Sequence, residues 1–297
     1  MTTQLIIQAA DIETQDLKTL HGLCSASGIE KMDGAGNFDH QAFRILNVAN
    51  SVCTDPAARA NIQRYCEEHS LDFGFVDSNA TLAQFGLLAM DMDSTLITIE
   101  CIDEIADYAG KKTQVSAVTE AAMRGEIDWP ASLRQRAALL AGLPESVLEK
   151  VYTERLKLSA GAEHLIAAAK RNHLKLLLVS GGFTFFTERL KMRLGFDYAF
   201  SNTLEINHGI LTGRVIGSLC DAAAKAIHVR NAASLLGLQP AQVMVIGDGA
   251  NDLLMMREAG SAIAFHAKPV VRAQANYALN HVGLDGVLGL FTSTEAK

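Results

Sequence analysis

Two aspartates stand one residue apart in this sequence, directly after an apolar run. Residues 87–90 are followed by Asp91 and Asp93, and then by the hydroxyl residues Ser94 and Thr95. A run that is apolar throughout is typical of a buried strand in a parallel sheet, and alternate side chains of a strand share one face. We therefore expect both carboxylates on one side of a strand's carboxyl end, where open α/β sheets bind ligands.

Two carboxylates so close together repel each other unless a cation lies between them or one of them keeps its proton. The pair is therefore a candidate for metal binding or acid–base chemistry. The alternative is a polar turn that caps a helix, because Asp, Ser and Thr are common N-cap residues.

A second apolar run, residues 174–179, ends in Ser180, Gly181 and Gly182 before an expected helix from about Phe183. A hydroxyl group, accessible backbone N–H groups and a helix N-terminus together suit a phosphate group. Glycines also occur in such turns for conformational reasons alone. By itself, this segment is weak support for phosphate binding.

The third apolar run, residues 243–246, precedes two further acidic residues. Asp248 falls at the expected strand end, and Asp252 lies in the first turn of the helix expected to follow. Hard oxygen ligands in such a place suit Mg²⁺. Lys225 lies in an expected helix capped by Asp221, between two of these runs. It is a candidate phosphate ligand, although a lone lysine is usually a surface charge.

The elements around these strand ends include a helical region. It is expected directly after the first of the strands, where it interrupts the alternation of strands and helices. Between residues 101 and 158, apolar residues recur at helical spacing in four segments, with Gly110, Gly125 and Gly142 as helix ends. Short amphipathic helices bury their apolar faces against one another, which predicts a four-helix bundle. Such an insert above the carboxyl edge of a sheet is well placed to act as a lid.

Several side chains of this region are candidates for contact with a substrate. They are Glu100, Met123, Trp129, Arg134 and Arg136. Solvated charge or bundle core is the ordinary explanation for residues of these types. An enclosed arginine, however, can bind a carboxylate through two parallel hydrogen bonds.

Residues 1–80 show a different pattern, strand-helix-strand-strand-helix-strand, which is typical of a ferredoxin-like α+β domain. A turn-rich stretch at 33–37 precedes its third expected strand, and residues 77–80 form a plausible linker to a second domain at 83–297. The topology resembles ACT-type regulatory domains. Because a fold alone does not define a function, an accessory or dimerisation role and amino-acid sensing both stay open.

The bulk composition excludes several classes of protein. The 297 residues are 49% hydrophobic, and the net charge of −7 argues against general nucleic-acid binding. The five cysteines show no CxxC spacing, which favours reduced thiols in the cytoplasm. We expect no signal peptide and no membrane span, because no apolar run is long enough to cross a bilayer.

Four motifs, in this order along the chain, resemble the haloacid dehalogenase (HAD) superfamily of aspartate-nucleophile phosphatases. They are residues 91–95, residues 180–182, Lys225 and residues 247–252. Residues 100–106, 132–136, 180–183 and 264–269 narrow the resemblance to the phosphoserine phosphatases, over about residues 85 to 290. The resemblance implies a Rossmann-like parallel-sheet core with a helical cap. It also implies hydrolysis of O-phospho-L-serine through an aspartyl-phosphate, the last step of serine biosynthesis.

The same resemblance assigns roles to the catalytic and metal-binding residues. It makes Asp91 the nucleophile and Asp93 the general acid that protonates the leaving serine and then activates water. It implies Mg²⁺ held by the Asp91 carboxylate, the Asp93 backbone carbonyl and Asp248. Asn251 and Asp252 would support that site, Asp252 also by orienting Lys225.

The resemblance likewise assigns the substrate contacts. The phosphate would be held by residues of the strand-end loops and by the lysine, namely Ser180, Gly181, Gly182, Lys225 and Asn251. Glu100 would receive the substrate ammonium and Arg136 its carboxylate, with Met123 and Trp129 lining the lid pocket. Family members often carry Phe at the position of Trp129, which implies a slightly altered pocket.

Three alternatives remain open at this point. The protein could pass the phosphoryl group to another alcohol such as homoserine, or it could act on another small phosphorylated amino acid or alcohol. It could also be a regulatory protein with an inactive core, which the intact catalytic set argues against. ACT-like domains often pair, so a homodimer is also open.

Overall fold

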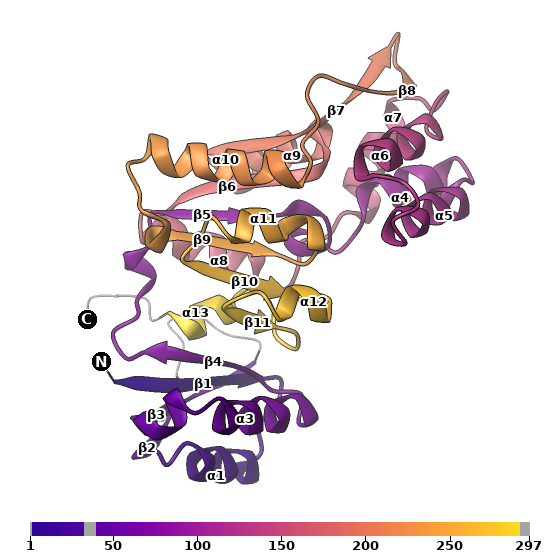
Figure 1. The fold of residues 1–297 in the computed structure, drawn as a ribbon. Helices are drawn as coiled ribbons and strands as arrows, with labels where there is room; N and C mark the ends of the chain where they lie inside the picture. Colours follow the sequence, from indigo (N-terminus) through magenta and orange to yellow (C-terminus); the bar gives the residue numbers. More distant parts are fainter. Residues whose placement is uncertain (1, 33–39, 292–297) are drawn as a thin grey trace.

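The computed structural model describes residues 2–32 and 40–291, apart from the side chain of Met123. One sheet of 11 strands runs through this part of the chain, in the order β2-β3-β1-β4-β11-β10-β9-β5-β6-β7-β8 (Figure 1). The strands are β1 (Thr3–Ala9), β2 (Gly28–Lys31), β3 (Gln41–Leu46), β4 (Asp72–Asp77), β5 (Leu87–Met90), β6 (Lys175–Phe183), β7 (Tyr198–Asn207), β8 (Ile210–Ile216), β9 (Val243–Gly247), β10 (Ser261–Phe265) and β11 (Tyr277–Leu279).

The core of the molecule is a parallel sheet between two layers of helices, which confirms the predicted Rossmann-like α/β fold. Its parallel strands run from β11 to β7, and β8 pairs antiparallel with β7. One face carries α8 (Ala162–Arg171), α9 (Thr184–Leu194) and α13 (Gly286–Leu290), and the other carries α10 (Ala222–Leu235), α11 (Leu253–Met256) and α12 (Pro269–Arg272).

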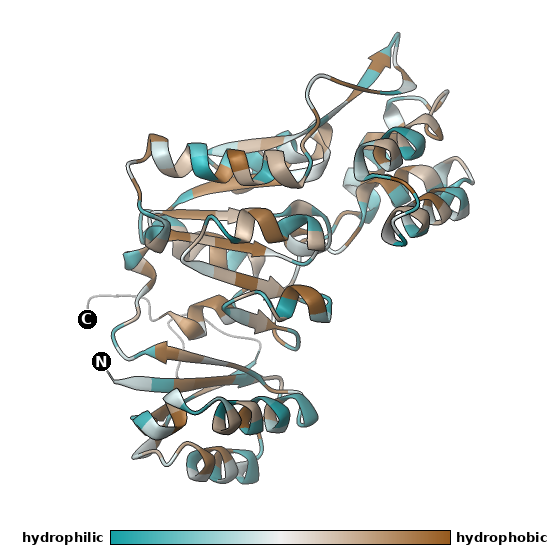
Figure 2. Ribbon diagram, in the orientation of Figure 1, coloured by the Kyte–Doolittle hydropathy of each residue, from teal (hydrophilic) through white to brown (hydrophobic). Residues whose placement is uncertain are grey.

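The central strands are hydrophobic on both faces because helices cover both (Figure 2). Leu88 and Met90 of β5 join the cluster under α8 and α9, and Leu87 and Ala89 join the cluster under α10. No helix in the described part of the chain is long and apolar enough to cross a membrane.

The sheet order brings the three motif-bearing strands together. Strand β5 lies between β6 and β9, and Met90 is level with both Leu178 and Ile246. Parallel strands in register end at the same edge of a sheet. The residues that follow these three positions therefore lie side by side at the carboxyl edge.

The strand β6 is longer than the sequence pattern predicted. Residues 180–182 belong to the strand instead of a turn, and α9 begins at Thr184. The pairing of β6 with β7 shifts in register between Val179 and Phe183, where it resumes opposite Asn202. The two glycines therefore occupy an irregular stretch of strand whose pairing a local pattern could not reveal.

The predicted four-helix insert is present and stands beside the carboxyl edge as a cap (Figure 1). It contains α4 (Cys101–Tyr108), α5 (Lys112–Met123), α6 (Trp129–Ala138) and α7 (Ser146–Lys150), followed by one irregular turn, η3 (Val151–Arg155). Gly110, Gly125 and Gly142 have φ values of 63°, 76° and 86°, the left-handed conformation that lets a helix end. The two chain segments that connect the cap to the core pair with each other at Ile97 and Leu158.

The hairpin of β7 and β8 turns at His208 and Gly209, which both have positive φ. Its tip contacts the cap instead of remaining free. The N–H of Gly142 donates to the carbonyl of Leu211 at 2.9 Å, and the N–H of Leu211 donates to the carbonyl of Leu143 at 2.8 Å. The hairpin therefore links the core sheet to the cap at a place remote from the two chain connections.

The N-terminal unit has the predicted ferredoxin-like order of elements. Its strands form the antiparallel order β2-β3-β1-β4. The helices are α1 (Thr14–Leu23), a short α2 (Asn50–Thr54) and α3 (Pro56–Glu68), for which Asp55 is the N-cap. The turn-rich stretch predicted at 33–37 lies outside the described residues.

The N-terminal unit is joined to the core through the sheet itself, which the sequence did not predict. Strand β4 pairs antiparallel with β11 at Phe73 and Ala278. The buried carboxylate of Asp72 accepts three backbone N–H groups of the loop after β11, at 2.7, 2.8 and 3.0 Å. On the same face, Gln8, the cross-strand partner of Asp72, donates through Nε2 to the carbonyl of Gly286 at 3.0 Å, where α13 packs against β1.

Candidate active site

Asp91 is the first residue after β5 and is almost completely buried. Its Oδ1 accepts the N–H of Met92 at 2.7 Å, and its Oδ2 lies 2.9 Å from Nζ of Lys225. Ser94, with φ of 55°, turns the chain back in the following loop, and its hydroxyl donates to Glu100 Oε1 at 2.8 Å. One carboxylate oxygen of Asp91 is therefore fixed by backbone and the other by a cation.

Lys225 lies 1% exposed in the first turn of α10, where Asp221 caps the helix by accepting the N–H of Ala224. Its ammonium contacts both Asp91, at 2.9 Å, and Asp252, at 2.8 Å. Burial alone lowers the pKa of this lysine, but the carboxylates of Asp252 and Asp91 raise it above its ordinary value. Lys225 therefore carries a permanent positive charge beside Asp91.

Asp252 organises the loop after β9. Its Oδ1 accepts Lys225 and, at 3.4 Å, the amide of Asn251. Its Oδ2 accepts the N–H groups of Asp248 and Gly249 at 3.2 and 3.0 Å. Each oxygen of Asp252 therefore accepts two donors, whereas each oxygen of Asp91 has one polar contact within the described part of the chain, so Asp252 is suited to support the site instead of binding an ion directly.

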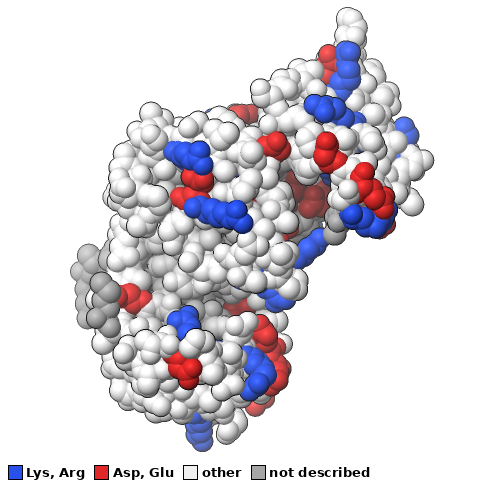
Figure 3. Space-filling model, viewed as in Figure 1, with Lys and Arg blue, Asp and Glu red and all other residues white. Residues whose placement is uncertain are grey.

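The site carries more negative than positive charge, which fits a metal ion. Carboxylate oxygens of Asp91, Asp248 and Asp252 lie within 4.8 Å of one another. Burial and the charge of Asp252 raise the pKa of Asp248 to about 6 and that of Asp91 well above its ordinary value. Figure 3 shows acidic side chains set back in the hollow between the core and the cap. Asp91 and Asp248 are the hard oxygen donors available to a divalent cation here.

Thr95 is a site residue that the sequence analysis did not single out. Its buried hydroxyl donates to Asp248 Oδ1 at 2.9 Å. Its backbone carbonyl accepts the hydroxyl of Ser159 at 2.6 Å. The position of Thr95 at the end of the acidic motif could have indicated a role in the site. Its partner Asp248, however, lies 153 residues further along the chain.

Asp93 is held between the core and the cap. Its Oδ1 accepts the N–H of Cys101, at 3.2 Å, where α4 begins. A Cβ at Gly182 would lie 2.6 Å from Asp93 Oδ2, so a side chain at position 182 would displace this carboxylate. Burial, and then the nearby Glu100, raise the pKa of Asp93 to about 7. A carboxyl group with this pKa can donate and accept a proton near neutral pH.

The irregular end of β6 is fixed by Asn202, which the sequence analysis missed. Ser180 Oγ accepts the N–H of Gly182 at 2.8 Å. Asn202, fully buried on β7, donates to the carbonyl of Gly181 and accepts the N–H of Cys220, both at 2.8 Å. No local pattern could have marked this role, because the partners of Asn202 lie 21 and 18 residues away along the chain.

The cap brings two of its predicted substrate contacts to the same cleft. Trp129 lies over β6, where a Cβ at Gly181 would be 3.1 Å from Trp129 Cζ2. Arg136 is half-buried on α6, and its Nε has no hydrogen-bond partner among the described residues. Burial lowers the pKa of Arg136, while Glu100 and Asp103 act against that shift. An orphaned guanidinium N–H suits an incoming carboxylate.

The other cap residues predicted to contact a substrate are Arg134, Met123 and Glu100. Arg134 is exposed, so the structure gives it no enclosed position like that of Arg136. The side chain of Met123 lies outside the described part of the chain. Glu100 is exposed at the start of the cap, where Ser94 fixes its carboxylate.

Comparison with protein families gives two matches. A model of the haloacid dehalogenase-like hydrolases matches residues 88–257, which contain β5, the cap and the loop after β9. A domain of unknown function, DUF4072, matches residues 5–62 of the N-terminal unit.

Curated relatives named phosphoserine phosphatase include the following two. That of Albidiferax ferrireducens is 54% identical over 215 residues, covering 71% of this chain and 91% of the relative. That of Haemophilus influenzae is 38% identical over 296 residues, covering 99% of this chain and 94% of the relative.

Solved structures of a hydrolase and a phosphatase are also similar to this chain. A HAD family hydrolase of Salmonella enterica serovar Typhi has a TM-score of 0.89 and 34% identity, with both chains covered completely. A phospho-aspartyl intermediate analogue of a phosphoserine phosphatase has a TM-score of 0.66 and 37% identity, and covers 70% of this chain and 99% of its own.

Proposed function

The chain belongs to the haloacid dehalogenase-like hydrolase family, and from this premise we propose that it hydrolyses O-phospho-L-serine to L-serine and phosphate. The observation that carries the proposal is the buried pair of Asp91 and Lys225, 2.9 Å apart, with the raised-pKa Asp93 two residues further on. A fixed nucleophile, a permanent cation and a titratable acid are the groups that phosphomonoester hydrolysis needs.

The cap residues support the choice of substrate. Phosphoserine carries an ammonium and a carboxylate besides its phosphate. Glu100 and Arg136 stand at the cleft with opposite charges, and the Nε of Arg136 has no partner among the described residues. We assign the substrate ammonium to Glu100 and its carboxylate to Arg136, with Trp129 and Met123 lining the pocket. Ser180, Gly181, Gly182, Lys225 and Asn251 would then hold the phosphate.

The reaction proceeds in two displacements. Asp91 attacks phosphorus, the bond from phosphorus to the serine oxygen breaks, and Asp93 gives its proton to that oxygen. The carboxylate of Asp93 then takes a proton from water, whose oxygen attacks the phosphorus of the aspartyl-phosphate. Phosphate leaves, and Asp91 returns as a carboxylate. Lys225 offsets the charge of the phosphate oxygens in both steps, and the closed cap positions serine and excludes bulk water.

We propose Mg²⁺ as the metal ion, held by the Asp91 and Asp248 carboxylates and the backbone carbonyl of Asp93. When bound, Mg²⁺ supplies positive charge that polarises the phosphate group. Thr95 and Asp252 orient the ligands from behind, since one donates to Asp248 and the other holds the backbone of that loop.

Three further assignments remain proposals of the same kind. They are the division into an N-terminal domain at 1–80 and a catalytic domain at 83–297 with a cap at 101–158, a cytoplasmic location, and a homodimer. Limited proteolysis, cell fractionation and light scattering would test them in turn.

Phosphate release from L-phosphoserine tests the function directly, with Mg²⁺ and with EDTA, in the parent and in Asp91→Asn. We expect Mg²⁺-dependent release that the substitution abolishes, because the amide has lost the nucleophilic charge. Phosphothreonine and phosphoethanolamine serve as competing substrates. A preference for either would contradict the substrate assignment, and phosphoryl transfer to an added alcohol such as homoserine would contradict hydrolysis as the second step.

A further inference from the structure

Ser159 is a buried serine at the point where the chain leaves the cap and returns to the core. Its hydroxyl donates to the carbonyl of Thr95 at 2.6 Å. A serine close before a helix often caps that helix. Here, however, Gly161 is the N-cap of α8, and the hydroxyl of Ser159 points to Thr95 instead. The side chain of Ser159 therefore contacts the loop after β5 and leaves the start of its own helix to other groups.

The backbone of Ser159 is fixed on both sides. The two segments that connect the cap to the core lie side by side here. The N–H of Thr98 donates to the carbonyl of Lys157 at 3.0 Å, and the N–H of Ser159 donates to the carbonyl of Leu96 at 2.9 Å. The carbonyl of Ser159 accepts the N–H of Ala162, in α8, at 3.1 Å. Because its N–H and its carbonyl are both bonded, Ser159 presents its hydroxyl in one defined direction.

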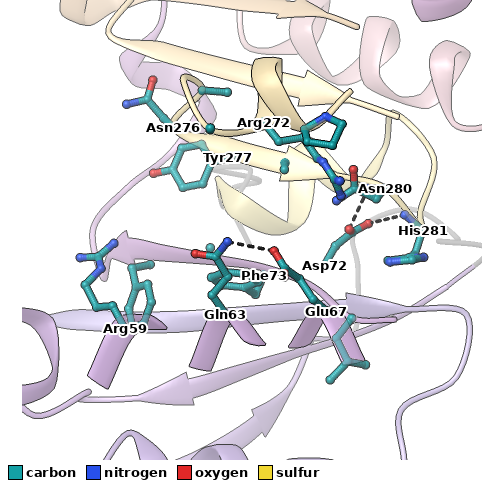
Figure 4. Close-up of a pocket in the computed structure, with 17 residues that line it drawn as sticks. Arg59, Gln63, Glu67, Asp72, Phe73, Arg272, Asn276, Tyr277, Asn280 and His281 are labelled. Carbon is teal, nitrogen blue, oxygen red and sulfur yellow. Dashed lines mark hydrogen bonds between the residues drawn. The ribbon is translucent and has the colours of Figure 1, made fainter. Parts of the chain in front are cut away.

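The core also holds the residue that follows. The carbonyl of Ala160 accepts the N–H of Leu284 at 2.8 Å, in the loop after β11. The carboxylate of Asp72 fixes the same loop, at one end of a groove between the N-terminal unit and the core (Figure 4). Ser159 therefore stands on a part of the core that is anchored independently of the cap.

Thr95 links Ser159 to the proposed metal site. It is completely buried, and its hydroxyl donates to Asp248 Oδ1 at 2.9 Å while its carbonyl accepts Ser159. Among the residues that the structure describes, no other hydroxyl or N–H group donates to the carboxylate of Asp248. Two polar groups of Thr95 thus point in opposite directions, one to Asp248 and one to Ser159. In a buried place, no water replaces a donor that is lost.

We propose that Ser159 is a positioning residue of the metal site, which acts on Asp248 through Thr95. Groups that orient the ligands of a metal ion typically change its affinity by about 10–100-fold when they are removed. The proposal rests on the proposed function, since it takes Asp248 as a ligand of Mg²⁺. It makes the junction of cap and core part of the metal site, because the segment that leaves the cap then fixes where a ligand stands.

Isothermal titration of the full chain with Mg²⁺, without substrate, tests the proposal. We expect Ser159→Ala to raise the dissociation constant of Mg²⁺ by about threefold or more, the equivalent of one lost hydrogen bond. Ser261→Ala is the matched control. It also removes a buried hydroxyl, but that of Ser261 has no hydrogen-bond partner among the described residues. The control should leave the dissociation constant unchanged.

Two further substitutions separate the hydroxyl from packing. Ser159→Thr and Ser159→Val introduce side chains of the same shape, of which only threonine keeps a hydroxyl. We expect Ser159→Thr to bind Mg²⁺ like the parent and Ser159→Val to bind it as weakly as Ser159→Ala. This pair decides the question even if the alanine variant does not fold, and circular dichroism checks the fold of each variant.

A double-mutant cycle tests the route through Thr95. Thr95→Val removes the hydroxyl that contacts Asp248 and should weaken Mg²⁺ binding by about 10–100-fold. In that background, Ser159→Ala should change the dissociation constant no further, because the contact through which it acts is already gone.

The proposal is overturned if Ser159→Ala and Ser159→Val bind Mg²⁺ as tightly as the parent. It is also overturned if the losses of Ser159→Ala and Thr95→Val add in the double variant, or if the parent binds no Mg²⁺. Phosphate release is measured separately on the unsubstituted chain. A chain that binds Mg²⁺ with the help of Ser159 but releases no phosphate would refute the proposed function and leave the role of Ser159 standing.

Discussion

At the scale of single residues, the site depends on how each carboxylate is paired. Asp91 and Asp252 share Lys225, Asp248 accepts the hydroxyl of Thr95, and Asp93 accepts the N–H of Cys101. Burial and the nearby Glu100 raise the pKa of Asp93 to about 7, so this carboxyl group can hold a proton near neutral pH. Four similar side chains acquire different roles because their surroundings differ.

The acid role of Asp93 predicts a dependence on the leaving group. We expect Asp93→Asn to lower kcat for phosphoserine by about 10²–10⁴-fold, because the departing alkoxide is no longer protonated. The kcat for p-nitrophenyl phosphate should fall much less, since its leaving group is stable as an anion. Steady-state kinetics with both substrates measure the difference, and equal losses would refute the acid role.

The same role predicts a pH dependence. Asp93 is protonated below its pKa of about 7 and loses the proton as pH rises through that value. The rate with phosphoserine should therefore fall above this pH, while the rate with p-nitrophenyl phosphate should not. Parallel pH profiles for the two substrates would contradict the prediction.

The buried lysine predicts an effect on stability. Lys225→Met removes the cation between Asp91 and Asp252 and leaves both carboxylates buried without it. Breaking such a buried pair costs about 3–5 kcal/mol. The free energy of unfolding, measured in EDTA, should therefore fall by a similar amount. Urea denaturation measures it, with the exposed Lys150→Met as control. A loss no larger than that of the control would contradict the pairing.

At the scale of elements, the cap is held to the core at two places. Its two connecting segments pair at Ile97 and Leu158, and the hairpin of β7 and β8 contacts the loop after α6. Gly213 of β8 lies directly against the cap, because a Cβ there would lie 2.9 Å from Ala141 Cβ and 3.1 Å from the backbone of Ala138. The hairpin therefore fixes where α6, with Trp129 and Arg136, stands above the sheet.

This contact predicts that Gly213→Ala moves the cap. Gly217→Ala is a matched control, since both glycines have φ near +78° but nothing lies within 4 Å of a Cβ at 217. Both variants should lose about 1–3 kcal/mol of stability through backbone strain. Only Gly213→Ala should also raise KM for phosphoserine, because α6 is pushed aside. Equal KM values would show that the hairpin does not position the cap.

At the scale of the whole molecule, the N-terminal unit and the core share one sheet and a continuous interface. Asp72 fixes the loop after β11, and its cross-strand partner Gln8 fixes α13 on the same face of the sheet. Because these hydrogen bonds join the two units across a continuous interface, the units should unfold together. We therefore expect a single calorimetric transition for the full chain.

Asp72→Ala should separate the two units. It removes the buried carboxylate that accepts three backbone N–H groups, at a cost of about 3 kcal/mol. Differential scanning calorimetry should then show an earlier transition for the N-terminal unit. Asp77→Ala is the control, because the carboxylate of Asp77 accepts the N–H of Asn79 within a local turn. A single, unshifted transition in Asp72→Ala would contradict the coupling.

The sequence by itself determined what depends on neighbouring residues. Apolar runs gave the strands β5 and β9, helical spacing gave the four cap helices, and Asp221 marked the start of α10. The acidic motif at 91–95 and the loop at 247–252 indicated the chemistry. Periodicity and capping are local properties, so a short window of residues contains them.

The tertiary structure decided what depends on pairing between distant segments. It extended β6 through residues 180–182, placed Asn202 behind Gly181, and joined β4 to β11. It also decided that Arg136 is enclosed while Arg134 is exposed. Which strands pair, in which register, and which face of a helix is covered depend on the packing of the whole chain. No local pattern in this sequence contains that information.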